Sequence, residues 1–386
     1  MSVDKSTAAG RNSGIDLMKV LMTLFVCILH IINQGGAQQG AYANNSTYIL
    51  LITVKSAVVC AVNGFAMISG YVGCNSKYRF SRIIWLYVTV MIYNFIIPPV
   101  IYHSYSDYSY IQIEFDSNYV LKGLFPVVFC TSWYFSAYFG MFFLIPFINS
   151  AVKNTDRNLA LKLIGCLFFF ICFFQSTIIM LEKIPQYDSF GVNYGYSMMW
   201  LALMYLAGAI VRQHEPFRNV NKWIFLAAFA VLTALGTGLT LYMYHSYSLD
   251  RINGPNDYAE LMLNYNSPVT AAQAFCLLLF FSKIRTANAV KKIMIFLVPH
   301  TFSIYIIHTQ AYIWDYVIRD SYSGIGEKAP LTAVLSLLCS GIIVFSVCLL
   351  IDYPVYKIVG LARSLSERLC MRIKHRTDDS AVSNKP

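Results

Sequence analysis

Apolar residues along this chain fall into ten blocks, which are separated by short polar stretches. An α-helix needs about 20 residues to cross roughly 30 Å of hydrocarbon, and each block is close to that length. The pattern therefore predicts an all-α, polytopic membrane protein. The ten predicted helices cover residues 17–33, 48–72, 83–102, 132–152, 159–181, 196–211, 223–244, 267–282, 296–316 and 331–351.

The composition excludes a soluble enzyme. Of the 386 residues, 57% are hydrophobic and 12% are charged, whereas about 25% charged residues is usual for a soluble domain. The formal net charge is +10, but the basic residues lie in the connections between apolar blocks and form no contiguous patch. We therefore expect no nucleic-acid partner and interpret these charges as signals of membrane topology.

Basic residues concentrate on alternate connections. If the N-terminus is cytoplasmic, 23 of the 29 lysines and arginines lie on the cytoplasmic side, which predicts that both termini are cytoplasmic. We expect a cytoplasmic segment at 1–16, a ten-helix membrane domain at 17–353 and a basic tail at 354–386 that anionic lipid attracts. The bacterial plasma membrane is the expected location.

The ten cysteines do not suggest a disulfide framework or a metal site. Seven of them lie inside apolar blocks, and none of those has CxxC spacing. We expect reduced cysteines that pack between helices, and no bound metal.

The first predicted helix carries Asp16, Lys19 and His30. Charged groups inside a span are costly, so a functional role is the first hypothesis. Lys19 and His30 are eleven residues apart, which places both on one face, with the imidazole about 16 Å farther across the membrane. Asp16 lies one turn before Lys19 and is expected to pair with it. The alternative is that Lys19 reaches the headgroups and His30 makes an ordinary interhelical hydrogen bond.

A cluster of polar and small residues near the end of the second helix contains Asn63, Ser69 and Tyr71. On its own, this cluster is explained by close helix packing. The next connection carries Arg79 and Arg82, three residues apart, and a pair of guanidinium groups suits phosphate oxygens. An ordinary positive-inside loop would show the same pattern.

Trp133 and Tyr134 open the fourth predicted helix, where aromatic residues are typical of the membrane interface. The ninth helix carries Tyr305 and His308, and His308 lies about as deep as His30. Two imidazoles at similar depth could share a polar cavity, but the sequence does not show that the two helices touch.

In their order and spacing, these residues resemble the acyltransferase-3 family of integral membrane proteins, which O-acylate sugars and other cell-envelope acceptors. The family pattern in the first helix is Arg, ten residues, His. Here Lys19 stands at the Arg position. It keeps the positive charge but lacks the planar guanidinium group, which can make a bidentate contact, while His30 matches directly. Arg79 and Arg82 match an Arg-x-x-Arg pattern. The resemblance covers nearly the whole chain and rests on residues 14–17, 30, 68–71, 79–82, 133–134, 146–147, 265–268 and 303–308.

The resemblance implies transfer of an acyl group, with acetyl expected, from acyl-CoA to a hydroxyl of an envelope saccharide or lipid-linked precursor. Arg79 and Arg82, with help from Lys19, would hold the CoA phosphates at the cytoplasmic mouth. His30 would act as general base or take the acyl group transiently. The expected catalytic group is His30, Lys19 and Asp16, and the candidate oxyanion donors are Ser69, Tyr71 and Tyr305. The residues expected to line the site are Asn63, Ser69, Tyr71, Trp133, Tyr134, Tyr305 and His308.

Two other functions fit the same residues. A transporter or flippase of an envelope precursor or small solute would line its path with these charged groups, although the chain shows no clear internal symmetry. A sensor or membrane partner that has lost acyltransferase activity is the third reading, for which Lys19 in place of arginine is the only indication. Acetyl and succinyl transfer would need the same anchors for CoA.

Overall fold

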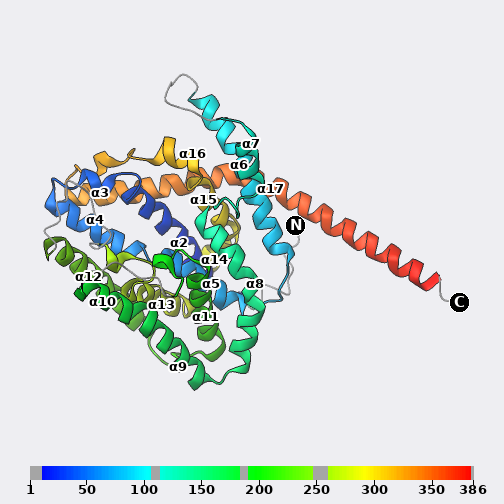
Figure 1. The fold of residues 1–386 in the computed structure, drawn as a ribbon, viewed down its shortest axis with the longest axis horizontal. Helices are drawn as coiled ribbons and strands as arrows, with labels where there is room; N and C mark the ends of the chain where they lie inside the picture. Colours follow the sequence, from blue (N-terminus) through cyan, green and yellow to red (C-terminus); the bar gives the residue numbers. More distant parts are fainter. Residues whose placement is uncertain (1–10, 106–113, 183–189, 247–259, 384–386) are drawn as a thin grey trace.

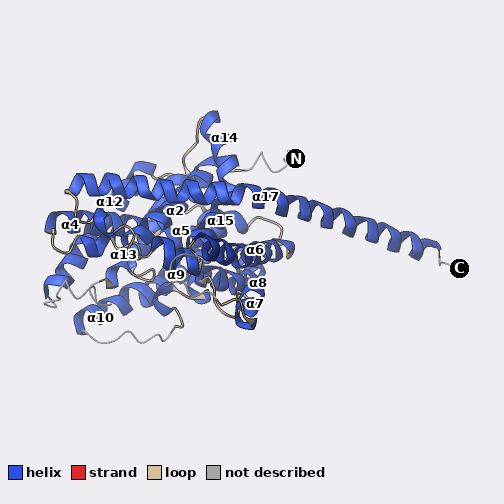
Figure 2. Ribbon diagram, turned by 90° about the horizontal axis from the view of Figure 1, so that it is seen from above, coloured by secondary structure: helices blue, strands red, loops and turns tan. Residues whose placement is uncertain are grey.

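The computed structural model describes residues 11–105, 114–182, 190–246 and 260–383, and within these ranges the chain forms helices and no strand. The helices pack into one bundle from which a single long helix, α17, projects (Figures 1 and 2). The helices are α2 (Ser13–Ile32), α3 (Ala37–Gly40), α4 (Asn45–Val58), α5 (Ala61–Gly73), α6 (Ser81–Ser104), α7 (Ser117–Leu124), α8 (Trp133–Asn154), α9 (Arg157–Phe168), α10 (Gln175–Glu182), α11 (Met198–His214), α12 (Lys222–Ser246), α13 (Pro268–Ser282), α14 (Asn288–Leu297), α15 (Thr301–His308), α16 (Ala311–Ile313) and α17 (Pro330–Ser383).

Each of the ten predicted blocks is helical. The second is divided into α4 and α5, and the fifth runs from α9 through a π-helical turn into α10. The ninth differs from its predicted bounds of 296–316: the observed span is Asn288–His308, which joins α14 to α15, and residues 309–310 interrupt the helix before α16. Eight helical segments of the described chain are long and apolar enough to cross a membrane. They are Ser13–Ile32, Asn45–Gly73, Ser81–Ser104, Trp133–Asn154, Arg157–Ile178, Lys222–His245, Asn288–His308 and Pro330–Ser366.

The other two predicted spans, α11 and α13, are short. They have 17 and 15 residues, so they rise about 25 Å and 22 Å, less than the roughly 30 Å of hydrocarbon. Both start late because the preceding chain is irregular. A turn at Asn193–Gly195 and the cap Ser197 precede α11, while a turn at Leu261–Leu263 and the cap Ser267 precede α13.

Helix α2 lies within the bundle and packs against α4, α5, α13, α14, α15 and α17 (Figure 1). It begins where the Asn12 side chain accepts hydrogen bonds from two backbone N–H groups of the first turn, as an N-cap residue does. It ends before Gly35 and Gly36, and Gly36 has a φ of 82°, which glycine adopts without steric cost. We call the two ends of the bundle the Asn12 end and the Asn33 end.

Close packing explains the glycines of the 63–71 cluster. A Cβ atom at Gly70 of α5 would lie 1.9 Å from the backbone oxygen of Tyr205 in α11, and one at Gly208 would lie 2.0 Å from the backbone oxygen of Met67. Only glycine allows the two backbones to approach this closely.

The basic tail predicted at 354–386 is continuous with the last span. Helix α17 runs without a break across the predicted boundary at residue 353 and continues to Ser383. Its second half extends away from the bundle in both views (Figures 1 and 2).

Candidate active site

Two histidines from helices far apart in the sequence meet inside the bundle. His30 lies in the last turn of α2, and His308 is the last residue of α15, which packs against α2. Nδ1 of His30 and Nε2 of His308 are 3.0 Å apart. The structure therefore brings together the two imidazoles that the sequence placed at similar depth.

The hydrogen bonds around this pair define which nitrogen atoms carry hydrogen. Nδ1 of His308 lies 2.6 Å from the carbonyl oxygen of Ile304, and a carbonyl only accepts, so Nδ1 is the donor. In the neutral ring, Nε2 of His308 is then an acceptor and receives the Nδ1–H of His30. Nε2 of His30 keeps a free lone pair, because no atom of the described residues bonds to it.

Aromatic rings surround the histidine pair. The indole of Trp314 meets the His30 imidazole edge-on, with ring centroids 4.7 Å apart. The ring centroids of Tyr305 and His308 are 6.1 Å apart, and those of Tyr134 and Tyr305 are 5.8 Å apart. Two of the predicted lining residues, Tyr134 and Tyr305, are therefore connected to the pair.

The predicted ion pair between Asp16 and Lys19 is wrong. The Asp16 carboxylate is held by Arg11, whose Nε lies 2.5 Å from Oδ2, because the chain before α2 folds back over the first turn. Lys19 forms no ion pair or hydrogen bond through its amine within the described residues. Its amine lies between the two ends of α2, where the Asp16 charge acts on it without direct ion-pair contact.

Asn63 and Ser69 serve the packing of α5. The Asn63 side chain is fully buried, donates to the carbonyl oxygen of Tyr265 at 2.7 Å and accepts from the indole of Trp200 at 2.8 Å. Ser69 donates to the carbonyl oxygen of Phe65, one turn earlier in the same helix. In the part of the chain that the structure describes, neither residue contacts the histidine pair, and both fit the packing interpretation of the cluster.

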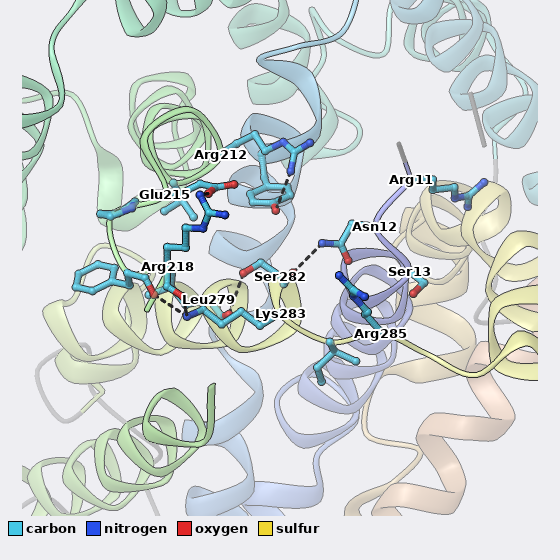
Figure 3. A pocket seen from close by; sticks show the side chains of 15 residues that line it. Arg11, Asn12, Ser13, Arg212, Glu215, Arg218, Leu279, Ser282, Lys283 and Arg285 are labelled. Carbon is cyan, nitrogen blue, oxygen red and sulfur yellow. Dashed lines mark hydrogen bonds and ion pairs between the residues drawn. The ribbon is translucent and has the colours of Figure 1, made fainter. Parts of the chain in front are cut away.

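A large cationic cavity opens at the Asn12 end (Figure 3). It has a volume of about 700 Å³ and lies between the start of α2 and the last turns of α5, α11 and α13. Tyr71 lines it and accepts a hydrogen bond from Arg212, whose guanidinium lies 5.2 Å from the Tyr71 ring centroid. The five basic residues of the lining are Arg11, Arg212, Arg218, Lys283 and Arg285.

The cavity carries excess positive charge. Glu215, its one acidic lining residue, lies 3.8 Å from Arg218. Lys283 donates to three backbone carbonyls rather than to a carboxylate, and neither Arg212 nor Arg285 has a carboxylate within 4 Å in the described chain. Anions are therefore favoured here.

The arginines chosen from the sequence lie elsewhere. Arg79 and Arg82 are exposed at the start of α6 and are not among the residues that line the cationic cavity. The sequence did contain the basic residues of the cavity, but they are distributed over three separate stretches of the chain, at residue 11, at 212–218 and at 283–285, so only folding gathers them.

A smaller pocket of about 80 Å³ lies at the Asn33 end, and the residues that line it do not include either histidine. Leu29 and Asn33, which flank His30 in α2, contribute to its wall. Lys55 of α4 also lines it, is only 4% exposed, and forms an ion pair at 2.7 Å with Glu260. Gln38 contacts both charged groups. This pair is not among the residues predicted from the sequence, although a lysine inside the second apolar block is itself a functional signal.

The ionised form of Glu260 is favoured in the folded protein. Burial alone would raise its pKa, but the charge of Lys55 and hydrogen bonds from Lys55 and Gln38 outweigh burial and lower the pKa below its ordinary value.

A second buried polar group joins α6, α15 and α17. Asp352, which is 1% exposed, lies 2.5 Å from Nδ1 of His300 and accepts a hydrogen bond from the hydroxyl of Tyr93 at 2.5 Å. This group is not among the residues predicted from the sequence either, and its signal is again an ionisable residue beside an apolar block.

Within the described ranges, no cluster of three or more His, Cys, Asp or Glu side chains could hold a metal ion. The nine cysteines described there are free.

Comparison with known proteins identifies the family. A family model described as an acyltransferase domain matches residues 12–353, which include α2, both histidines and residues 330–353 of α17. No curated protein and no solved structure shows significant similarity to the chain. Because the match covers most of the sequence, the chain belongs to the acyltransferase-3 family of membrane proteins.

Proposed function

We propose that this protein transfers an acyl group, expected to be acetyl, from acyl-CoA to a hydroxyl of a cell-envelope saccharide or lipid-linked precursor. One observation carries the proposal. His30 has an unshared lone pair on Nε2, is held in that tautomer by His308, and lies on a helix that begins at a cationic cavity. Family membership implies acyl transfer, and this geometry supplies a base for it.

The cationic cavity is the proposed site for the CoA end of the donor. CoA carries several phosphate charges, and the positive-inside bias places the Asn12 end in the cytoplasm, where acyl-CoA is found. Arg212, Lys283 and Arg285 lack carboxylate partners and suit phosphate oxygens. The pantetheine arm would then follow α2 past Lys19 to His30. Arg79 and Arg82 remain a second proposed phosphate contact on the neighbouring loop.

The chemical step needs one proton acceptor. Nε2 of His30 takes the proton of the acceptor hydroxyl, the hydroxyl oxygen attacks the thioester carbonyl, and the C–S bond breaks to release CoA, which recovers the proton. In the alternative route, Nε2 itself attacks the thioester carbonyl and the C–S bond breaks to release the CoA thiolate. The acceptor hydroxyl then attacks the acyl-imidazole, the C–N bond breaks to return His30, and the hydroxyl proton goes to the thiolate. Of the three candidate oxyanion donors, Tyr305 contacts the histidine pair, whereas Tyr71 lines the distant cavity.

The proposed location is the bacterial plasma membrane, with both termini in the cytoplasm and the tail on the inner lipid surface. The transporter alternative finds no support in the family match, which is to an acyltransferase domain. The envelope acceptor and the acetyl group are parts of the proposal.

The test is acyl transfer by purified protein in proteoliposomes that are supplied with radiolabelled acetyl-CoA and a crude pool of envelope glycans. Wild-type protein should label glycan. The transfer rate of His30→Ala should be at least about 100-fold lower than that of wild type, because a general base typically contributes 10²–10⁴-fold. His245→Ala, at an exposed histidine at the end of α12, is the matched control and should keep full activity. Full transfer by His30→Ala would contradict the proposal.

The same preparation tests the donor site. Arg285→Ala and Lys283→Ala should each raise the KM for acetyl-CoA without a matching loss of kcat. An Arg79→Ala, Arg82→Ala variant compares the exposed loop with the cavity. If only the loop variant raises this KM, the phosphates bind there and not in the cavity.

A further inference from the structure

The irregular chain before α11 and α13 reaches far into the bundle. Lys55 is ten residues beyond Asn45, the start of its span, and therefore lies about 15 Å along the helix. Oε2 of Glu260 lies 2.7 Å from Nζ of Lys55, so the segment before α13 reaches the level of Lys55 in the bundle. Irregular backbone at membrane depth is tolerated only where it is buried in protein or lines a water-filled cavity. The pocket at the Asn33 end lies against this segment and supplies such a cavity.

Unused hydrogen-bonding groups face this pocket. Asn33 of α2 and Asn264 of the descending segment both line it, and neither side-chain amide has a hydrogen-bond partner within the described chain. The Glu260 side chain is 21% exposed beside them. Two amides and a carboxylate offer both donors and acceptors, which is the combination that a hydroxyl-rich ligand needs.

An aromatic surface completes the pocket. Tyr196 lines the pocket and is 45% exposed. Its ring centroid lies 4.8 Å from that of Tyr265 and 4.5 Å from that of Trp133. Trp133 also stacks on Tyr265 with an interplanar angle of 20°. The three rings support one another, so Tyr196 is a preorganised apolar face with a polar edge. The C–H face of a sugar ring can pack on such a surface while its hydroxyls reach the amides.

We propose that this pocket is the acceptor subsite, and that it binds one edge of a sugar ring through Asn33, Asn264, Glu260 and the face of Tyr196. This inference rests on the proposed function. The volume of about 80 Å³ suits the reacting hydroxyl and its neighbours on the ring, with the rest of the glycan outside. Leu29 and Asn33 line the pocket and lie within one helical turn of His30 on α2, so a sugar held here is within one helical turn of the proposed base.

The test measures sugar binding without any transfer reaction. The protein is placed in lipid nanodiscs, and saturation-transfer difference NMR follows two probes, methyl β-glucopyranoside and the methyl glycoside of N-acetylglucosamine. Cyclohexanol, a ring with a single hydroxyl, is the control ligand. We expect the wild type to bind at least one glycoside in preference to cyclohexanol.

The variants locate the binding. Asn33→Ala combined with Asn264→Ala should weaken glycoside binding about tenfold, because two hydrogen bonds are lost. Tyr196→Ala should weaken it several-fold, whereas Tyr196→Phe keeps the apolar face and should bind nearly as well. Asn118→Ala, at an exposed asparagine of α7 outside the pocket, is the matched control and should bind like wild type.

Acetyl-CoA binding is measured on every variant, so that a folding defect is not mistaken for a loss of the subsite. Glycoside binding that is unchanged in the pocket variants, or absent from the wild type, overturns the acceptor subsite. If the wild type binds glycoside through these residues but transfers no acyl group, the subsite stands and the proposed reaction fails.

Discussion

At the scale of single residues, the candidate chemistry depends on hydrogen positions in two rings. The carbonyl of Ile304 requires a hydrogen on Nδ1 of His308, which makes Nε2 an acceptor and turns the Nδ1–H of His30 toward it. His308 is thus a positioning residue, and His30 is the group that would touch the reacting atoms. This division of roles resembles a catalytic base with its orienting partner.

Replacement of His308 by alanine should lower kcat by at least about tenfold, and by less than the His30→Ala variant, because the base remains but its orientation is lost. The KM for acyl-CoA should not change, since His308 does not reach the cationic cavity. His308→Gln keeps a side-chain oxygen that can accept from His30 and should recover part of the rate. Steady-state kinetics check this, and equal kcat values for wild type and His308→Ala would exclude the positioning role.

At the scale of helices, the close approach of α5 and α11 sets the geometry of the cavity. Gly70 and Gly208 place the two backbones in contact, and the last turns of both helices line the cationic cavity. The site and the packing interpretation of residues 63–71 are therefore compatible. Tight packing here positions Tyr71, the residue after Gly70, and Arg212, one turn after Gly208.

Gly70→Ala tests this contact. The added Cβ would lie 1.9 Å from a backbone oxygen of α11, so the helices must separate, and we expect a loss of about 2 kcal/mol or more of stability. Gly165→Ala is the matched control, because this helical glycine has no atom within 4 Å of the added Cβ, and alanine there should stabilise by about 0.5–1 kcal/mol. Apparent melting temperatures in detergent give the comparison, and similar values for the two variants would refute the close contact.

At the scale of the whole molecule, α2 connects two polar regions at opposite ends of the bundle. Its first residues line the cationic cavity, its last turn lines the small pocket, and Lys19 lies between them. The pocket in turn depends on the ion pair of Lys55 with Glu260, which ties the chain before α13 to α4 and, through Gln38, to α3.

This ion pair predicts a dependence of stability on pH. The pKa of Glu260 is lower in the folded protein than its ordinary value of 4.5, so the carboxylate stabilises the fold above that value. The contribution declines as the pH falls through the folded pKa. Glu260→Gln should cost about 3 kcal/mol at neutral pH, because it leaves Lys55 buried without a counter-charge.

Unfolding measured between pH 3 and pH 7 checks the prediction. Wild type should lose stability below about pH 4.5, and Glu260→Gln should show a weaker dependence over the same interval. Parallel curves for the two proteins would show that Glu260 is not the responsible group.

Apolar blocks and short motifs are local properties of the chain. The sequence therefore predicted the class of protein, the approximate places of ten helical blocks and the family. It also supplied His30 and His308 as candidates, but not their contact, since they are 278 residues apart. The sequence also did not show that α11 and α13 are too short to span the membrane. Each is preceded by an irregular segment that enters the bundle.

The pairing of charged side chains depends on the tertiary structure. Asp16 pairs with Arg11 instead of Lys19, Glu260 reaches Lys55, and the cavity gathers basic residues from three separate stretches of the chain. Such partners depend on the rotation and depth of each helix in the bundle. Both are set by contacts between distant segments, where backbones approach through glycine and an irregular chain carries polar groups inward.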